Sequence, residues 1–168
     1  MLWKRNDSSQ TNIYDMVELK ALKFKPIFKD KIWGGNKLKS LFNYDYSPLP
    51  NCGEAWVLSG VPGNESIVSE GPFEGNTLNE MVEIFMGELV GDNIYYEFGN
   101  EFPLLIKLLD ANDKLSIQVH PDDIMAQKKG LARGKTEMWY VLEAEEGAQL
   151  INGFKGKIGP EEYLELVE

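Results

Sequence analysis

The chain contains one cysteine, Cys52, and one histidine, His120. A single cysteine excludes an intramolecular disulfide and a cysteine-rich zinc cage, and it favours a reducing compartment. No apolar run approaches the roughly 18 residues that a membrane-spanning helix needs. The N-terminus also lacks the continuous apolar core of a secretory signal. We therefore expect a cytoplasmic protein that does not bind membranes.

Positive charge is scarce as well. The 168 residues include 17 Lys and Arg against 27 Asp and Glu, which gives a formal net charge of −10. A non-specific nucleic-acid binder needs the opposite balance, so that class is excluded. A phosphorylated substrate would need local positive side chains against this unfavourable background field. Length and a hydrophobic content of 43% are typical of a globular domain, and disorder of the whole chain is not expected.

Hydrophobic patterning divides the chain into a tail and a folded part. Residues 1–18 have no clear period and are expected to form a disordered extension, with a docked arm as the alternative; residues 19–168 form the folded part. A helix is expected at 77–86, where Thr77 and Glu80 have the spacing of a capping box. A second helix begins at Pro160, and 121–134 is a loop or short helix. Strands are expected at 22–28, 54–59, 66–69, 104–110, 115–120, 137–144 and 149–154. Such a pattern indicates a mainly β protein, a sandwich or barrel with helical insertions.

The strand expected at 115–120 has two chemically different faces. Alternation places Ser116, Gln118 and His120 on one face and aliphatic residues on the other. Unpaired buried polar groups cost about 1–3 kcal/mol each, so the polar face needs solvent, hydrogen-bond partners or a ligand. Glu137 opens the next expected strand and would lie beside His120 if the two strands were neighbours. Imidazole and carboxylate together suit zinc, although a glutamine ligand is unusual. These residues alone leave open a solvated polar face and a metal site.

Four segments resemble the type I mannose-6-phosphate isomerases, zinc phosphomannose isomerases of the cupin superfamily, in their short bacterial form. They run in the family's order from about residue 19 to the last residue, and QVHP followed by Lys-X-Glu is specific to the family. The segments are LKFKPIFKDKIWGG, GEAWVLS, FPLLIKLLDANDKLSIQVHPDD and GKTEMWYVLEA. The resemblance implies a partial cupin, a jelly-roll-like β-sandwich with helical insertions.

The resemblance also implies a metal site. It assigns Gln118, His120 and Glu137 as protein ligands of one zinc ion, with the family's fourth ligand, a histidine, expected downstream of residue 168. An arginine accompanies that histidine in the family's pocket. The chain is therefore expected to be the N-terminal part of a catalytic domain, with little or no isomerase activity by itself.

Further positions match the family's pocket. Lys135 corresponds to a lysine of the catalytic pocket, while Ser116 and Lys107 resemble residues at its phosphate end. Lys107 could instead be a solubilising charge at a strand edge. Trp33 and Glu54 match motif positions without a firm role, and Glu54 could simply brace a turn. The tryptophans at positions 56 and 139 are interpreted as core aromatics.

The implied reaction interconverts D-mannose 6-phosphate and D-fructose 6-phosphate through a cis-enediol. Zinc and Lys135 would stabilise negative charge on the enediolate oxygens. The long forms of the family have a histidine before the lysine of Lys-X-Glu, whereas this chain has Gly134, so a mechanism that uses that histidine does not transfer. The alternatives are a non-catalytic cupin-like sugar-phosphate-binding domain and a purely structural β domain.

Overall fold

The computed structural model describes residues 18–131 and 133–167, which fall into two compact units. The first unit ends at Leu115 and the second begins at Ser116. The extension expected at 1–18 lies outside the described residues, except for Glu18, which is exposed and irregular. None of the helices in the described ranges is long and apolar enough to cross a membrane.

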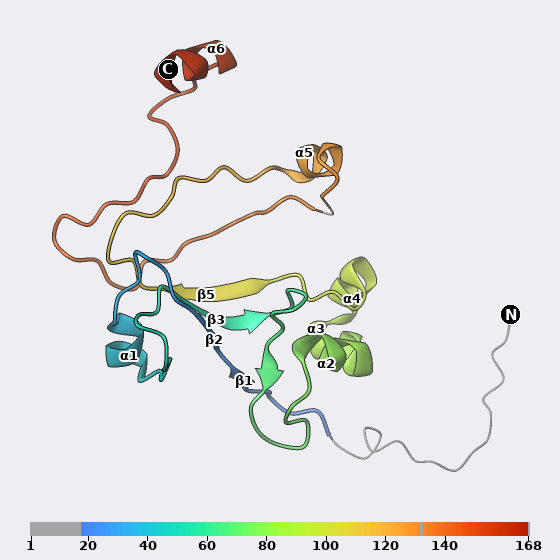
Figure 1. Cartoon of the computed structure of the whole chain (residues 1–168). Coiled ribbons are helices and arrows are strands. Elements are labelled where there is room, and N and C mark those ends of the chain that lie inside the picture. The colour runs from blue at the N-terminus through green and yellow to red at the C-terminus, as the bar shows by residue number, and fades with distance from the viewer. Residues whose placement is uncertain (1–17, 132, 168) are drawn as a thin grey trace, which may run out of the picture. The chain divides into compact units, whose positions relative to one another are not determined.

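A three-stranded antiparallel sheet forms the centre of the first unit. Its strands are β2 (Ile27–Lys29), β3 (Glu54–Ser59) and β5 (Leu105–Leu109), in the order β2-β3-β5 (Figure 1). Ala55 pairs with Phe28 on one side and Leu108 on the other. Paired residues of an antiparallel ladder point to the same face, so these three side chains share one face of the sheet. That face is the inner one, because Ala55 is fully buried.

The other face of this sheet carries charged side chains. In the same register, Glu54 pairs with Lys29, and Trp56 pairs with Lys107. The sequence alternates accordingly along β3, with Ala55 inside and its two neighbours outside. Two lysines, one glutamate and one tryptophan from three different strands therefore meet on one surface.

A smaller sheet pairs β1 (Phe24–Lys25) with β4 (Ile67–Val68). The strand expected at 22–28 is thus split, and Pro26 lies between β1 and β2. Proline has no backbone N–H to donate to a ladder, so a continuous strand through this position is disfavoured. Val68 of this sheet is buried in a cluster with Phe73 and Met81.

Helix α2 (Leu78–Phe85) supplies Met81 to that cluster and forms as the sequence predicts. The Thr77 side chain accepts a hydrogen bond from the Glu80 N–H, and the Glu80 carboxylate accepts one from the Thr77 N–H. The predicted capping box is therefore confirmed. Two short helices follow, α3 (Gly87–Val90) and α4 (Asp92–Phe98). Figure 1 shows these three helices grouped near one end of the three-stranded sheet.

Helix α1 (Lys37–Phe42) was not expected from the sequence. The residue before it, Asn36, makes no side-chain cap. Instead, the Lys37 N–H donates to Asp110 Oδ2 at 2.6 Å, from just beyond the end of β5. A carboxylate at a helix N-terminus accepts a hydrogen bond from an otherwise unpaired N–H. Asp110, a residue remote in sequence, therefore caps this helix.

The second unit has two short helices, α5 (Asp123–Lys128) and α6 (Pro160–Val167), joined by irregular chain. The expectation of strands at 115–120, 137–144 and 149–154 is wrong for this structure, because none of these residues belongs to a ladder. Alternation fixes which side chains share a side of an extended segment, whereas a strand also needs a partner that local sequence does not specify. Over the described ranges the regular structure is two small sheets with short helices and no closed barrel, so a mainly β jelly roll is not confirmed.

Candidate functional site

Three predicted site residues meet in the second unit. His120 Nε2 lies 3.0 Å from Glu137 Oε2, and Lys135 Nζ lies 3.6 Å from the same carboxylate oxygen. Lys135 Nζ also lies 3.2 Å from His120 Nε2. All three side chains are partly exposed, so a ligand from solution can reach them. The proximity expected of His120 and Glu137 is found, although the two strands that were to bring it about are not.

A closed loop produces this proximity instead. Asp122 caps the start of helix α5, because its carboxylate accepts a hydrogen bond from the Met125 N–H at 2.8 Å. The chain therefore turns directly after His120 and Pro121. The two segments flanking the helix then run beside each other (Figure 1). The Lys135 N–H donates to the Pro121 carbonyl oxygen at 3.1 Å, and this backbone bond joins the two segments next to the three side chains.

The charge of Glu137 is favoured by its surroundings. Partial burial raises the pKa of this carboxyl, but the Lys135 ammonium, a hydrogen bond from the Trp139 side chain and the His120 ring outweigh it. The net effect lowers the pKa of Glu137 below its ordinary value. Glu137 is therefore an ionised, hydrogen-bonded carboxylate at neutral pH.

Gln118 and Ser116 contact each other in the same unit. The Gln118 Nε2 donates to the Ser116 Oγ at 3.1 Å. This bond uses the amide nitrogen, so Oε1 is the Gln118 atom that can act as a metal ligand. Both side chains come from the segment that precedes His120.

Lys107 lies in the first unit, on the charged face of its sheet. Its ammonium lies 3.2 Å from Glu54 Oε2 and 4.7 Å from the centre of the Trp56 ring. Lys29 lies 5.0 Å from the same ring, and Lys31 Nζ lies 3.8 Å from Glu54 Oε1. This chain of net charge −10 thus gathers three lysines around one carboxylate and one indole.

Glu54 is the anion that pairs with Lys107 and Lys31, rather than the brace of a turn. Burial raises its pKa, but the hydrogen bond from Trp56 Nε1 at 2.6 Å and the charges of Lys107 and Lys31 outweigh burial and lower it. The Glu54 side chain is 13% exposed. A well-buried carboxylate that keeps its charge holds the neighbouring ammonium groups in place.

Two tryptophans have a role that sequence reasoning missed. Trp56 and Trp139, interpreted above as core aromatics, each donate to the glutamate two positions earlier, and Trp139 is 46% exposed. The signal was present in the sequence, because Glu-X-Trp occurs at Glu54 and again at Glu137. Residues i and i+2 of an extended chain project to the same side, which brings the indole N–H to the carboxylate.

The donor atoms of the second unit fit a zinc ion. The 3.0 Å between His120 Nε2 and Glu137 Oε2 is also an ordinary hydrogen-bond distance, and the Lys135 ammonium lies 3.2 Å and 3.6 Å from the same two atoms. Two ligand atoms of a tetrahedral zinc lie about 3.4 Å apart, close to this spacing. Within the described residues no cluster has three His, Cys, Asp or Glu side chains, so a third ligand from this unit would be the amide of Gln118.

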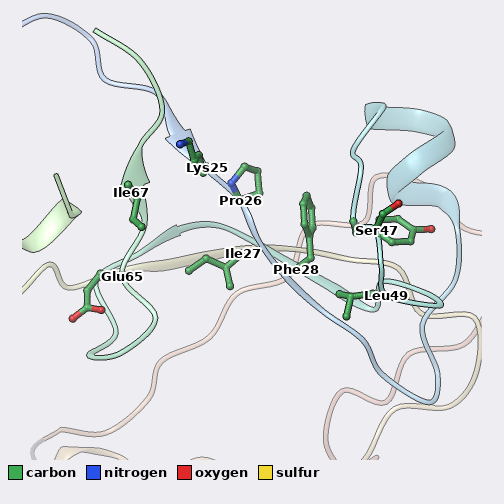
Figure 2. A pocket seen from close by; sticks show the side chains of 9 residues that line it. Lys25, Pro26, Ile27, Phe28, Ser47, Leu49, Glu65 and Ile67 are labelled. Carbon is green, nitrogen blue, oxygen red and sulfur yellow. The ribbon is translucent and has the colours of Figure 1, made fainter. Parts of the chain in front are cut away.

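Two cavities lie within the first unit. One, of about 390 Å³, is lined by Ile27, Phe28, Leu49 and their neighbours, with Lys25 and Glu65 at the polar positions (Figure 2). Another, of about 860 Å³, is an apolar groove between residues 19–24 and the helices α2–α4. No predicted site residue lines either cavity.

Comparisons with known proteins agree with the resemblance noted in the sequence. The chain matches the family described as phosphomannose isomerase type I, catalytic domain, over residues 21–157. It is 45% identical over 127 residues to a mannose-6-phosphate isomerase of Streptococcus mutans, a match that covers 76% of this chain and 38% of that protein. Mannose-6-phosphate isomerase ManA of Bacillus subtilis is 40% identical over 134 residues, covering 77% of this chain and 39% of that protein.

Solved structures agree as well. The crystal structure of mannose 6-phosphate isomerase from Bacillus subtilis matches with a TM-score of 0.62 and 39% identity, over 76% of this chain and 39% of that one. A mannose 6-phosphate isomerase structure bound with zinc and yttrium matches with a TM-score of 0.54 and 26% identity, over 65% and 28%. The chain spans less than half the length of the curated relatives named above. It belongs to the type I phosphomannose isomerase family.

Proposed function

We propose that this protein interconverts D-mannose 6-phosphate and D-fructose 6-phosphate. The observation that carries the proposal is the meeting of His120, Lys135 and Glu137 within the segment that matches the family. The relatives from Streptococcus mutans and Bacillus subtilis are named mannose-6-phosphate isomerases, which supports the same substrate.

Zinc is the metal that this donor set suits best. His120 and Glu137 present a nitrogen and an oxygen to the same point, and Gln118 adds an amide oxygen from the preceding segment. One relative is bound with zinc in its solved structure. Bound zinc supplies a Lewis acid that stabilises negative charge on a substrate oxygen.

Lys135 supplies a fixed positive charge beside the metal ligands. The reaction moves a proton between C1 and C2 through a cis-enediol, and a positive group held in place lowers the energy of the developing oxyanion. The contact with Glu137 holds the Lys135 ammonium near the metal ligands before substrate binds. Residue 134 has no side chain, so it provides neither an acid nor a base.

We keep Ser116 and Lys107 as two separate proposals for contacts with a phosphate, each within its own unit. A hydroxyl and an ammonium both donate hydrogen bonds to phosphate oxygens, and the charged donor makes the stronger bond. Glu54 and Trp56 hold Lys107 on the charged face of the sheet. Local lysines of this kind offset the acidic character of the whole chain.

A chimera tests the function directly. Residues 21–157 replace the matching segment of Bacillus subtilis ManA, and fructose 6-phosphate formed from mannose 6-phosphate is measured. We expect an active chimera whose kcat falls about 10²- to 10³-fold when it carries Lys135→Met, because a fixed charge at the transition state is lost. His120→Ala and Glu137→Ala should each remove the bound zinc. Lys155→Met, at an exposed lysine, is the matched control and should leave kcat unchanged.

Two outcomes would contradict the proposal. An inactive chimera that folds and still binds mannose 6-phosphate would identify the segment as a non-catalytic sugar-phosphate-binding domain. An active chimera whose kcat is unaffected by Lys135→Met would remove Lys135 from the mechanism.

A further inference from the structure

Gly134 lies where the backbone of a neighbouring segment leaves no room for a side chain. A Cβ atom at this position would lie 2.6 Å from the carbonyl carbon of Asp122 and 2.7 Å from both Asp123 N and Pro121 O. These are backbone atoms, which cannot move aside as the end of a flexible side chain can. The φ angle of Gly134 is not positive, so the constraint is one of space and not of backbone conformation.

Two hydrogen bonds hold the segments together at this close approach. The Gly134 N–H donates to Asp123 Oδ1 at 2.8 Å, and the Lys135 N–H donates to Pro121 O at 3.1 Å. The contact therefore involves the three residues that follow His120 on one side. On the other side it involves the residue directly before Lys135.

We propose that Gly134 is a positioning residue: its bare Cα and its N–H bond to Asp123 close the 121–134 loop and thereby hold Glu137 against His120. The geometric part of this inference stands on the contacts alone, while its consequence for a metal rests on the proposed function. In the 121–134 loop of this chain, a side chain at 134 would meet this backbone and push the two segments apart. His120 and Glu137 are anchored to those segments, so their 3.0 Å contact would open with them.

The single histidine makes this separation measurable without any metal. Diethyl pyrocarbonate modifies imidazole nitrogens with an absorbance change near 240 nm, and His120 is the only histidine of the chain. We expect Gly134→Ala to speed this modification about fivefold, the ratio that loss of one net hydrogen bond produces. Glu137→Gln, which weakens the contact directly, serves as the positive reference.

Gly156→Ala is the matched control, because a Cβ atom there would meet open space and its φ angle is not positive. Its modification rate should equal that of the unaltered chain. Asp123→Ala provides a second route to the same effect, since it removes the acceptor of the Gly134 N–H without adding an atom. Rates in Gly134→Ala and Asp123→Ala that both match Gly156→Ala would overturn the inference.

Titration of the full chain with Co²⁺ links the loop to metal binding. Changes in residues that orient metal ligands typically weaken affinity about 10- to 100-fold, and we expect Gly134→Ala to fall in this range. Gly156→Ala should bind as the unaltered chain does. If the unaltered chain binds no Co²⁺, the zinc proposal fails, while the modification rates still decide the role of Gly134. If both glycine variants bind Co²⁺ equally and are modified by diethyl pyrocarbonate at equal rates, Gly134 is not a positioning residue, and the zinc proposal stands.

Discussion

At the scale of single residues, Glu54 illustrates how neighbours decide a charge. Burial raises the pKa of its carboxyl, whereas Trp56, Lys107 and Lys31 lower it by a larger amount. A carboxyl with a lowered pKa in the folded protein stabilises the fold at pH values above its ordinary pKa of 4.5. That stabilisation is lost as the pH falls through the lower pKa of the folded state.

Glu54→Gln should therefore destabilise the chain in a pH-dependent way. At pH 7 we expect the free energy of unfolding to fall by about 1 kcal/mol, because the partly exposed ammonium groups of Lys107 and Lys31 lose their anion. The difference from the unaltered chain should begin to shrink below pH 4.5, where Glu54 of the unfolded chain becomes protonated, and should vanish as the pH falls through the lower pKa of the folded state. Urea unfolding at pH 7 and pH 3 measures both effects, with Glu83→Gln, an exposed position on α2, as the control. An equal loss at the two pH values would refute the electrostatic role of Glu54.

At the scale of elements, helix ends separate what local sequence specifies from what it does not. The box formed by Thr77 and Glu80 lies within four residues, and the sequence predicts both the helix and its cap. The N-terminus of α1 is capped by Asp110, which is 73 residues away from Lys37 along the chain. No local pattern announces such a partner, and the helix at 37–42 was missed.

Variants of Thr77 test whether the local cap stabilises α2. Thr77→Val keeps the shape of the side chain and removes the hydroxyl, so it should lower the free energy of unfolding by about 1 kcal/mol. Thr77→Ser keeps the hydroxyl and should remain close to the unaltered chain. Thermal and urea unfolding followed by circular dichroism give the two differences. Equal stability of the valine and serine variants would show that the hydroxyl contributes nothing.

For strands and site residues too, local sequence predicts some features, while others depend on residues that are remote in the sequence. Runs of mostly hydrophobic residues located β3 and β5. Their register places Lys107 beside Glu54 across 53 residues of sequence, and the sequence did not predict that ion pair. The meeting of His120 with Glu137 was expected from two neighbouring strands and from the family resemblance, although the structure has a closed loop at Gly134 and no pair of strands there.

At the scale of the whole molecule, the two units differ in how much they bury. The first contains clusters centred on residues such as Ala55 and Met81, both fully inaccessible. Among the described residues of the second unit, only Ala126 is buried. Backbone amides without ladder partners or buried contacts open at low free energy, so local stability should differ sharply between the units.

Hydrogen exchange measures this difference along the chain. Amides of β3 and β5 that donate within the ladder should exchange slowly, and those of 137–144 and 149–154 should exchange close to the rate of unstructured peptide. Amides of α5 should fall between these limits. Slow exchange at alternate residues of 137–144 would show that this segment is paired as a strand, as its sequence pattern suggests.

The repeated Glu-X-Trp unit has a consequence for binding entropy. Each glutamate receives a hydrogen bond from an indole of its own chain, so its rotamer is selected during folding and not when a ligand arrives. Immobilising a free side chain on association costs about 0.5–1.5 kcal/mol. At Glu54, whose side chain is 13% exposed, this ordering is complete beforehand, whereas at the more exposed Glu137 it is only partial.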